Sequence, residues 1–332
     1  MQVLPHAFNY FARNYYLVLI LHIAVVGTGN VGRATAYTIL YEGLPEELSL
    51  VDVKPGLAPA FAEELKHAAA GLRLDVEINA YERDEDLHGA DLVVICAGHP
   101  RKPGERITRR ELTKYNAEII RFIAEVIPPN NPGAKYVVVT NPVDAMATLF
   151  KKVSRTEFVV STGTHLETLR FRAKLAEALG IPVSKVDGYV GGEHGQAAVI
   201  LWSTVTAYGV GIDEYVRRRN ISLSKEGVEA YMKEVSEKII DVLGATRYGP
   251  AVAFRDIIKS IVLNLGMVLS IATPYRTEEI PEDVLVSRPT RVGLAIGPAY
   301  DNILTEEEKI KLNEAAKAIY STYRKALDLI SN

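Results

Sequence analysis

The stretch that decides the fold is HIAVVGTGNVG, residues 22–32. A mostly apolar run leads into a glycine turn, and a helix-compatible segment follows, so the stretch predicts a strand, a tight turn and a helix. Its glycines fit the pattern G-x-G-x-x-G in the context that this pattern requires. Gly27 permits the turn, Gly29 lets the backbone approach a pyrophosphate, and Gly32 lets the helix pack close to the strand. Because a helix N-terminus favours an anion, the stretch predicts a dinucleotide site.

An acidic residue follows at the distance that such a site needs. Asp52 ends the next predicted strand, twenty residues after Gly32. A carboxylate there accepts hydrogen bonds from the ribose hydroxyls and repels a 2′-phosphate, so NAD is favoured over NADP. Lys54 nearby leaves some use of NADP open. The alternative interpretation is a structural glycine turn with a solvated aspartate.

Predicted strands and helices alternate outward from this stretch. The first half contains strands at 22–26, 48–53, 92–97, 136–140 and 158–160, and helices at 31–41 and 59–70. This alternation predicts βαβ units and a parallel sheet covered by helices. Helices at 167–179, 225–243 and 306–329, with strands at 186–190, 198–206 and 291–296, predict a second lobe.

The predicted fold class is α/β, a doubly wound parallel sheet followed by an α/β (α+β) catalytic domain. The length of 332 residues favours two domains. We expect an N-terminal extension of unknown role at 1–20, a dinucleotide-binding domain at 21–143 and a catalytic domain at 144–332. The apolar run at 17–26 is too short to span a membrane, and no small-residue cleavage site follows it.

Composition excludes several classes of protein. Lys and Arg number 38 against 41 Asp and Glu, a net charge of −3, which argues against a nucleic-acid binder. The sequence has one cysteine, Cys96, and lacks Cys-x-x-Cys and zinc-type histidine spacings, so we expect neither a disulfide nor a metal site. This cysteine usage is typical of a cytoplasmic protein.

Three further segments place glycine, proline, amide and charged side chains after predicted strands. They are AGHPRKPGERITR (97–109), TNPVD (140–144), and GTHLETLRFR (163–172) together with GEHG (192–195). Ligands bind at the carboxyl ends of parallel strands, so these segments are candidates for a substrate site.

Over residues 21–330 the chain resembles the lactate/malate dehydrogenase family. GTGNVG, AGHPRKPG, TNPVD, LRFR and GEHG stand in the family's order and spacing. The resemblance implies a Rossmann domain followed by an α/β catalytic domain, NAD as the cofactor, and a homodimer or homotetramer.

The resemblance also assigns roles in the reaction. His194 matches the residue that exchanges a proton with the substrate, and Arg170 matches the arginine that clamps the substrate carboxylate through a bidentate fork. Glu167 stands where the family usually has an aspartate, and a glutamate can still accept from the imidazole Nδ1–H. Arg101 occupies the position that discriminates between substrates. An arginine there is similar to malate dehydrogenases, whereas lactate dehydrogenases carry a glutamine.

Two extra residues precede the arginine of the mobile loop. Arg109 fits that role better than Arg106, because Glu111, Leu112 and Asn116 then lie at the family's offsets of +2, +3 and +7. The resemblance implies that Arg109 polarises the substrate carbonyl.

The cofactor contacts follow from the same motifs. Asn141 matches the asparagine that bonds cofactor and substrate, and Asn116 matches one near the nicotinamide ribose. The expected set is Gly27, Thr28, Gly29, Asn30, Val31, Gly32, Asp52, Asn116, Val139 and Asn141.

The implied reaction is reversible hydride transfer between (S)-malate and NAD, giving oxaloacetate and NADH. Arg101 can pair the second carboxylate of oxaloacetate, a group that pyruvate lacks. The alternatives are a lactate or other 2-hydroxyacid dehydrogenase, and a non-catalytic nucleotide-sensing Rossmann protein. The set Asn141, Arg170 and His194 argues against the last, because binding alone needs no proton donor.

Overall fold

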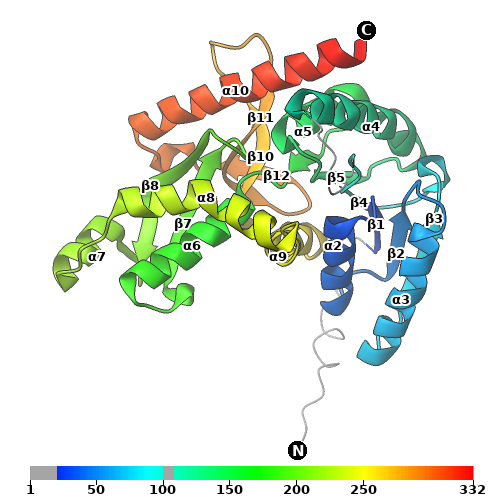
Figure 1. Ribbon diagram of the computed structural model, residues 1–332, viewed down its shortest axis with the longest axis horizontal. Helices are drawn as coiled ribbons and strands as arrows, with labels where there is room; N and C mark the ends of the chain where they lie inside the picture. Colours follow the sequence, from blue (N-terminus) through cyan, green and yellow to red (C-terminus); the bar gives the residue numbers. More distant parts are fainter. Residues whose placement is uncertain (1–20, 100–107, 332) are drawn as a thin grey trace, which may run out of the picture.

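The computed structural model describes residues 21–99 and 108–331 (Figure 1). Its strands are β1 (His22–Val26), β2 (Glu47–Val51), β3 (Glu77–Tyr81), β4 (Leu92–Ile95), β5 (Lys135–Val138), β6 (Val159–Ser161), β7 (Val186–Gly192), β8 (Ala198–Ala207), β9 (Val210–Gly211), β10 (Met267–Tyr275), β11 (Val284–Val292) and β12 (Ile296–Ala299). Its α-helices are α2 (Asn30–Tyr41), α3 (Leu57–Leu72), α4 (Arg109–Asn130), α5 (Val143–Ser154), α6 (His165–Leu179), α7 (Ile212–Arg219), α8 (Lys225–Leu243), α9 (Tyr248–Val262) and α10 (Glu306–Ser331). Short 3₁₀ turns lie at Asp84–Asp86, Val183–Lys185 and Asp301–Ile303.

These strands form one mixed sheet in the order β3-β2-β1-β4-β5-β6-β10-β11-β7-β8-β9, and β12 pairs with β11. Strands β1 to β6 are parallel, with β1 between β2 and β4. From β10 onward the neighbours are antiparallel. The α/β fold class predicted from the sequence is therefore confirmed. The domain boundary at residue 143 stays a prediction, and α5 and β6, which follow it, extend the parallel part of the sheet.

Helices cover both faces of the parallel strands (Figure 1). Successive side chains of a strand point to opposite faces, and β1 illustrates this. Ile23 and Val25 pack in one cluster with α2, α3 and α9. Ala24 and Val26 pack in the other cluster with α4, α5 and α10. Because helices bury both faces of β1, nearly all of its residues are apolar.

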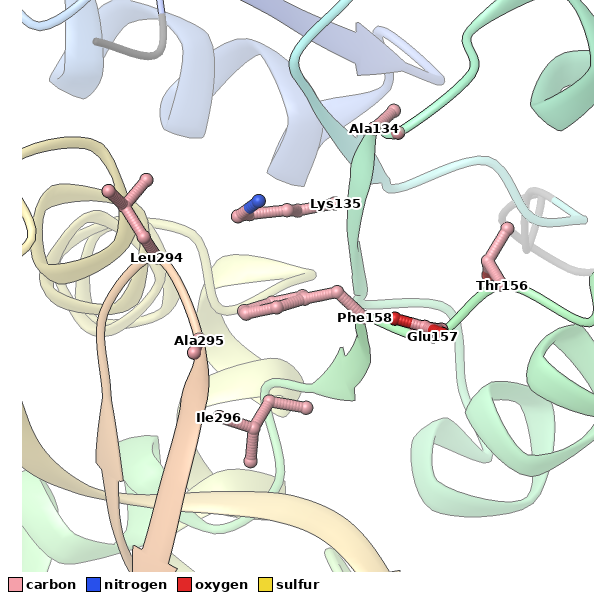
Figure 2. A pocket seen from close by; sticks show the side chains of 9 residues that line it. Ala134, Lys135, Thr156, Glu157, Phe158, Leu294, Ala295 and Ile296 are labelled. Atoms are coloured by element: carbon pink, nitrogen blue, oxygen red, sulfur yellow. The ribbon is translucent and has the colours of Figure 1, made fainter. Parts of the chain in front are cut away.

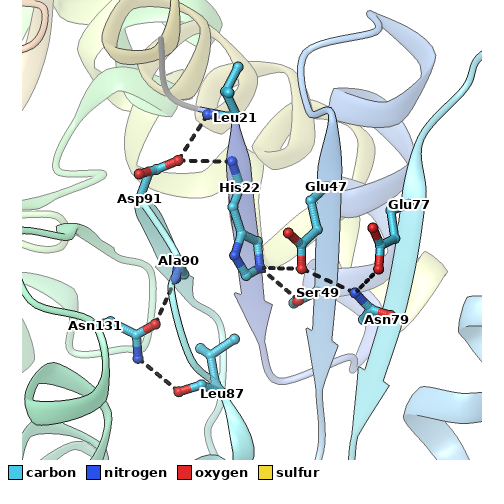
Figure 3. A network of polar contacts seen from close by, with 10 residues as sticks. All are labelled: Leu21, His22, Glu47, Ser49, Glu77, Asn79, Leu87, Ala90, Asp91 and Asn131. Atoms are coloured by element: carbon cyan, nitrogen blue, oxygen red, sulfur yellow. Dashed lines mark hydrogen bonds and ion pairs between the residues drawn. The ribbon is translucent and has the colours of Figure 1, made fainter. Parts of the chain in front are cut away.

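Polar contacts link the amino-terminal ends of the parallel strands (Figure 3). The Asp91 carboxylate accepts hydrogen bonds from the backbone N–H groups of Leu21 and His22, at 2.9 and 3.0 Å. The His22 Nε2 lies 2.7 Å from the Ser49 hydroxyl. The sequence motifs instead follow the carboxyl ends of the strands, so the candidate site lies at the opposite edge.

Two parts of the prediction from sequence need correction. The strand expected at 291–296 is wrong, because Gly293 donates a backbone hydrogen bond to the Ala295 carbonyl (3.1 Å) in a turn between β11 and β12. The edge strand β3 and the central strand β10 were not predicted.

Among the described residues, no helix is long and apolar enough to cross a membrane.

Candidate active site

The glycine turn lies at the carboxyl end of β1. Gly27 has a φ of +91°, and a Cβ there would stand 2.3 Å from the Ala97 nitrogen. A Cβ on Gly32 would stand 1.9 Å from the Gly27 carbonyl oxygen. Beside Gly29, in contrast, the described residues leave open space within 4 Å. The chain itself therefore requires the first and third glycines, while the space at the second suits a pyrophosphate close to the backbone.

Asp52 faces this turn from the end of β2. Its Oδ2 accepts hydrogen bonds from the Thr28 backbone N–H at 2.7 Å and the Thr28 hydroxyl at 3.1 Å. Its Oδ1 accepts from the Lys54 backbone N–H at 3.0 Å. An ionised carboxylate offers about four acceptor positions, so capacity for a ribose hydroxyl remains. Asn30 and Val31 begin α2 directly after Gly29, and Gly32 follows them in the same turn.

Asn116 of α4 joins the segments after β4 and β5. Its Nδ2 donates to the Asn141 carbonyl at 2.6 Å, and its Oδ1 accepts from the His99 backbone N–H at 2.7 Å. Asn141 is exposed and precedes Pro142 through a cis peptide, and Val139 directly follows β5. Asn116 is thus a clamp between two segments of the site, and its contact with a nicotinamide ribose stays a prediction.

His194, Glu167 and Arg170 lie together. His194 stands in the β7–β8 turn, residues 193–197. The register across β10 and β11 places Gly192, the last residue of β7, level with Ser161 at the carboxyl end of β6, just before α6 begins. The His194 Nδ1 lies 3.0 Å from the Glu167 Oε1, and an Arg170 Nη lies 3.5 Å from the same oxygen. The Nδ1–Oε1 contact is a close ion pair rather than a well-directed hydrogen bond, and Glu167 Oε2 is buried with no hydrogen-bond partner among the described residues.

The charges in this cluster shift the proton affinities of its members. Attraction to Glu167 raises the pKa of His194 to about 9, although burial opposes the shift. Asp144 adds to the increase, and Arg170 counters it. Burial is the largest single effect on the pKa of Glu167 and pushes it upward, but His194, Arg170 and a backbone hydrogen bond together outweigh it, so the net shift is downward. The pair is therefore an imidazolium–carboxylate pair at neutral pH. The His194 side chain keeps 27 % exposure, which leaves it accessible to a substrate.

Two family models match almost the whole described chain. The model for the lactate/malate dehydrogenase NAD binding domain matches residues 21–158, and that for the lactate/malate dehydrogenase alpha/beta C-terminal domain matches residues 164–329. The chain belongs to the lactate/malate dehydrogenase family. Its first part is thus an NAD-binding domain, as predicted from the glycine turn and Asp52.

Relatives of both kinds in this family are similar to the chain. A malate dehydrogenase from Sulfolobus acidocaldarius is 42 % identical over 305 residues, 92 % of this chain and 96 % of the relative. An L-lactate dehydrogenase from Thermoanaerobacterium saccharolyticum is 33 % identical over 92 % of this chain and 99 % of that protein. The crystal structure of a malate dehydrogenase from Plasmodium falciparum superposes with a TM-score of 0.86 at 28 % identity, over 93 % of this chain and 99 % of that one.

Sequence reasoning did not single out Asp144 as a site residue. This carboxylate lies in the first turn of α5 and is almost fully buried, which raises its pKa to about 6. It accepts a hydrogen bond from the His194 backbone N–H at 2.7 Å. The fifty residues between the two positions hide this contact from sequence patterns. The only sequence signal was an acidic residue at the end of the TNPVD segment.

Two predicted site residues have no described side chain. Arg101 lies outside the described residues, and Arg109 begins α4 with a side chain that is likewise outside them. The Thr108 hydroxyl accepts from the Glu111 backbone N–H at 3.1 Å, and the Glu111 carboxylate accepts from the Thr108 N–H at 2.9 Å. This capping box fixes where α4 starts. The substrate roles of both arginines stay predictions.

Three further polar or aromatic side chains of this region make structural contacts. His165 is buried, with its Nε2 3.2 Å from the Asp256 carboxylate. Arg172 donates to the Gly188 carbonyl at 3.0 Å. Trp202 packs edge-on against Phe171 in the core of the second lobe.

A cavity of about 470 Å³ lies away from these motifs (Figure 2). It opens at the start of β5, between Lys135, Phe158 and the β11–β12 turn. The Lys135 Nζ stands 5.4 Å from the centre of the Phe158 ring. None of its lining residues belongs to the predicted site, so the cavity is separate from it.

Across the described part of the chain, no group of three or more His, Cys, Asp or Glu residues is arranged to hold a metal ion.

Proposed function

We propose that the chain is an NAD-dependent malate dehydrogenase that interconverts (S)-malate and oxaloacetate. The observation that carries this proposal is the His194–Glu167 pair at 3.0 Å, with Arg170 beside the same carboxylate oxygen. A proton-exchanging group thus stands next to a cation that can hold an organic acid. The malate dehydrogenase relative at 42 % identity supports a dicarboxylic substrate.

The residues at the glycine turn fit NAD. Open space at Gly29 would take the pyrophosphate, and Asp52 keeps capacity to accept from a ribose hydroxyl. When bound, NAD supplies the acceptor for the hydride. Thr28 fixes the Asp52 carboxylate through two hydrogen bonds, so the negative charge that disfavours a 2′-phosphate is held in place.

His194 moves the proton at its Nε2, because its Nδ1 faces Glu167. In malate oxidation, neutral His194 accepts the hydroxyl proton while the carbon gives up a hydride. In oxaloacetate reduction, protonated His194 returns that proton to the carbonyl oxygen. With its pKa raised to about 9, His194 carries the proton at neutral pH, in the form that oxaloacetate reduction requires.

In this proposal, three arginines bind the substrate and polarise its carbonyl. Arg170 pairs the carboxylate next to the reacting carbon, and its guanidinium can do so through two parallel hydrogen bonds. Arg101 pairs the second carboxylate of malate or oxaloacetate. Arg109 polarises the carbonyl, which stabilises negative charge that develops on its oxygen.

The substrate preference tests the proposal directly. We expect kcat/KM to favour oxaloacetate over pyruvate by roughly 10⁴, because pyruvate would leave a desolvated Arg101 unpaired. Arg101→Gln should reduce this preference at least tenfold, and the matched variant Arg110→Gln, an exposed arginine of α4, should keep it. The assay compares oxaloacetate, pyruvate and larger 2-oxoacids, each with NADH and with NADPH.

Two outcomes of the assay would replace the proposal. A preference of the wild type for pyruvate would make the chain a lactate dehydrogenase, the activity that the name of the 33 % identical relative gives. Tight NADH binding without turnover of any 2-oxoacid would instead indicate a nucleotide-sensing protein.

We also propose that the enzyme acts in the cytoplasm as a homodimer or homotetramer. The single cysteine supports a reducing compartment. Exposed aromatic side chains on α2 and α9, Tyr37, Tyr41 and Tyr248, offer apolar area for association. Light scattering on the purified chain should give twice or four times the mass of one chain, and a monomer would contradict this proposal.

A further inference from the structure

A buried carboxylate lies beneath the two halves of the catalytic pair. The Asp144 Oδ2 accepts from the His194 backbone N–H at 2.7 Å, and its Oδ1 accepts from the Ser161 hydroxyl at 2.6 Å. Both Asp144 and Ser161 are almost fully buried. A carboxylate at such a place loses its hydration and needs strong donors in exchange, which these two short hydrogen bonds provide.

The Ser161 hydroxyl extends this contact to the start of α6. It accepts a hydrogen bond from the Gly163 backbone N–H at 3.0 Å. The next residue, Thr164, donates its N–H to the Ser287 hydroxyl at 3.1 Å and its own hydroxyl to the Val190 carbonyl at 2.6 Å. These bonds fix the segment from which α6 starts, and Glu167 stands in the first turn of that helix.

Asp144 is therefore linked to both partners of the ion pair. One carboxylate oxygen holds the backbone of His194, and the other holds, through Ser161, the segment that carries Glu167. The Nδ1–Oε1 contact of 3.0 Å is not well directed, so a small shift of either segment would change it. Positioning of this kind matters, since a displacement of about 1 Å at a reacting group can cost on the order of 10²-fold in rate.

We propose that Asp144, acting with Ser161, is a positioning residue that keeps His194 and Glu167 at the distance and orientation that proton transfer requires. The inference rests on the proposed function, in which His194 exchanges the proton with the substrate. Asp144 touches neither the substrate nor the cofactor in this proposal, because it reaches the reaction through the backbone of His194.

The test uses two variants and a matched control in the full-length chain. Ser161→Ala removes a buried hydroxyl that donates one hydrogen bond and accepts one. Ser260→Ala removes an equally buried hydroxyl with the same pattern, donating to the Val292 carbonyl at 2.7 Å and accepting from the Met267 N–H at 3.0 Å, outside the site. Asp144→Asn keeps an oxygen that accepts from the His194 N–H, but it loses the charge and turns an amide donor toward Ser161, whose hydroxyl donates to the wild-type carboxylate.

We expect Ser161→Ala to lower kcat for oxaloacetate reduction roughly 10- to 100-fold with the KM for NADH unchanged. Ser260→Ala should lose a comparable amount of stability in urea and keep kcat within about twofold, as expected of a hydroxyl remote from the site. This comparison separates a positioning role from a loss of stability.

Asp144→Asn adds a readout that a merely structural role would not move. The charged groups facing His194 are Glu167 and Arg170 from α6, Asp144 from α5 and Glu193 in its own turn. Loss of one neighbouring negative charge should lower the imidazole pKa by roughly half a pH unit or more. NMR titration of the His194 ring measures this without turnover, with the signal assigned by comparison with His194→Asn.

The outcomes distinguish this inference from the proposed function. If the wild-type chain fails to reduce oxaloacetate, the proposed function is wrong, and the NMR titration of Ser161→Ala, which keeps every charge, still decides whether this segment positions the imidazole: a lowered His194 pKa supports the positioning role. If Ser161→Ala keeps the wild-type pKa of His194, and the wild-type kcat with any 2-oxoacid that the enzyme reduces, the positioning role is overturned.

Discussion

Replacing Glu167 by glutamine isolates the charge that holds the proton on His194. The pKa of His194 rises from an ordinary value of 6.5 to about 9, and attraction to Glu167 is the largest cause. A shift of about 2.5 pH units corresponds to about 3.5 kcal/mol at ~1.4 kcal/mol per unit. Coulomb's law for two unit charges separated by the observed 3.0 Å gives about 5.5 kcal/mol at an effective dielectric constant near 20. Burial of the imidazole opposes this attraction, so the two magnitudes agree.

The expected result of Glu167→Gln follows from these numbers. With a pKa of about 9, about nine-tenths of His194 is protonated at pH 8, whereas a pKa near 6.5 leaves about 3 % protonated. The kcat/KM for oxaloacetate reduction at pH 8 should therefore fall up to roughly 30-fold, and the alkaline limb of its pH profile should move from about 9 toward 6.5. At pH 6 both forms are mostly protonated, so the loss should shrink there.

Steady-state reduction of oxaloacetate, measured from pH 5.5 to 10 with saturating NADH, gives the profile. Glu63→Gln is the matched control, because Glu63 pairs with His67 at 3.5 Å on the exposed face of α3. A limb that stays near 9 in Glu167→Gln would refute the assignment of the shift to this carboxylate. A loss of equal size at every pH would show that Glu167 orients the ring without setting its charge.

Three more substitutions test other parts of the molecule. Arg170→Lys should raise the KM for oxaloacetate roughly 10²-fold, since an ammonium cannot form the bidentate fork, and leave the Kd of NADH unchanged by fluorescence titration; an unaltered KM would remove Arg170 from the substrate site. Asp52→Asn keeps an acceptor for Thr28 but loses the charge, so the preference for NADH over NADPH in kcat/KM should drop roughly tenfold or more, and a constant preference would contradict the role of Asp52. Glu308 accepts hydrogen bonds from the Ser203 N–H at 3.0 Å and hydroxyl at 2.6 Å and from the Thr305 N–H at 2.8 Å, and its bonds with these two residues together outweigh the upward effect of burial, so its pKa is lowered. Its ionised form therefore stabilises the fold above the unfolded-state pKa, and this contribution is lost as the pH falls through the folded-state pKa. Glu308→Gln should lower the free energy of unfolding by ~1–3 kcal/mol at pH 7, with the difference from wild type vanishing in acid, and urea unfolding at both pH values checks this.

The parallel half of the fold was predictable because its signals are local. A buried parallel strand is apolar throughout or nearly so, as β4 and β1 are, and the glycine turn carries its own steric requirement at Gly27. The edge strand β3 was not predicted, since only Ile78 of its five residues is buried and the apolar signal is weak.

The antiparallel half depends on contacts between distant residues. Strands β10 and β11 pair through nine residues each, from Met267↔Val292 to Tyr275↔Val284, and no local pattern announces that pairing. The segment 291–296 was predicted as one strand, but Gly293 interrupts it, and a Cβ there would stand 2.4 Å from the Asn264 side-chain oxygen. Likewise, motifs identified His194 and Glu167, whereas the hydrogen bond that holds His194 in place involves Asp144, fifty residues away.

The shared carboxylate oxygen of Glu167 couples substrate binding to the proton. Arg170 lowers the proton affinity of His194 in the free enzyme, because it is a cation close to the same pair. A substrate carboxylate that pairs with Arg170 neutralises this cation, so substrate binding should raise the proton affinity of His194 further. Linkage is reciprocal, and protonated His194 must therefore bind the anionic substrate more tightly than neutral His194 does. Under the proposed function, oxaloacetate should therefore bind preferentially to the protonated enzyme, which is the form that can reduce it. Malate oxidation needs neutral His194. It should therefore reach its full rate only at a pH above the pKa that His194 has in the free enzyme, about 9.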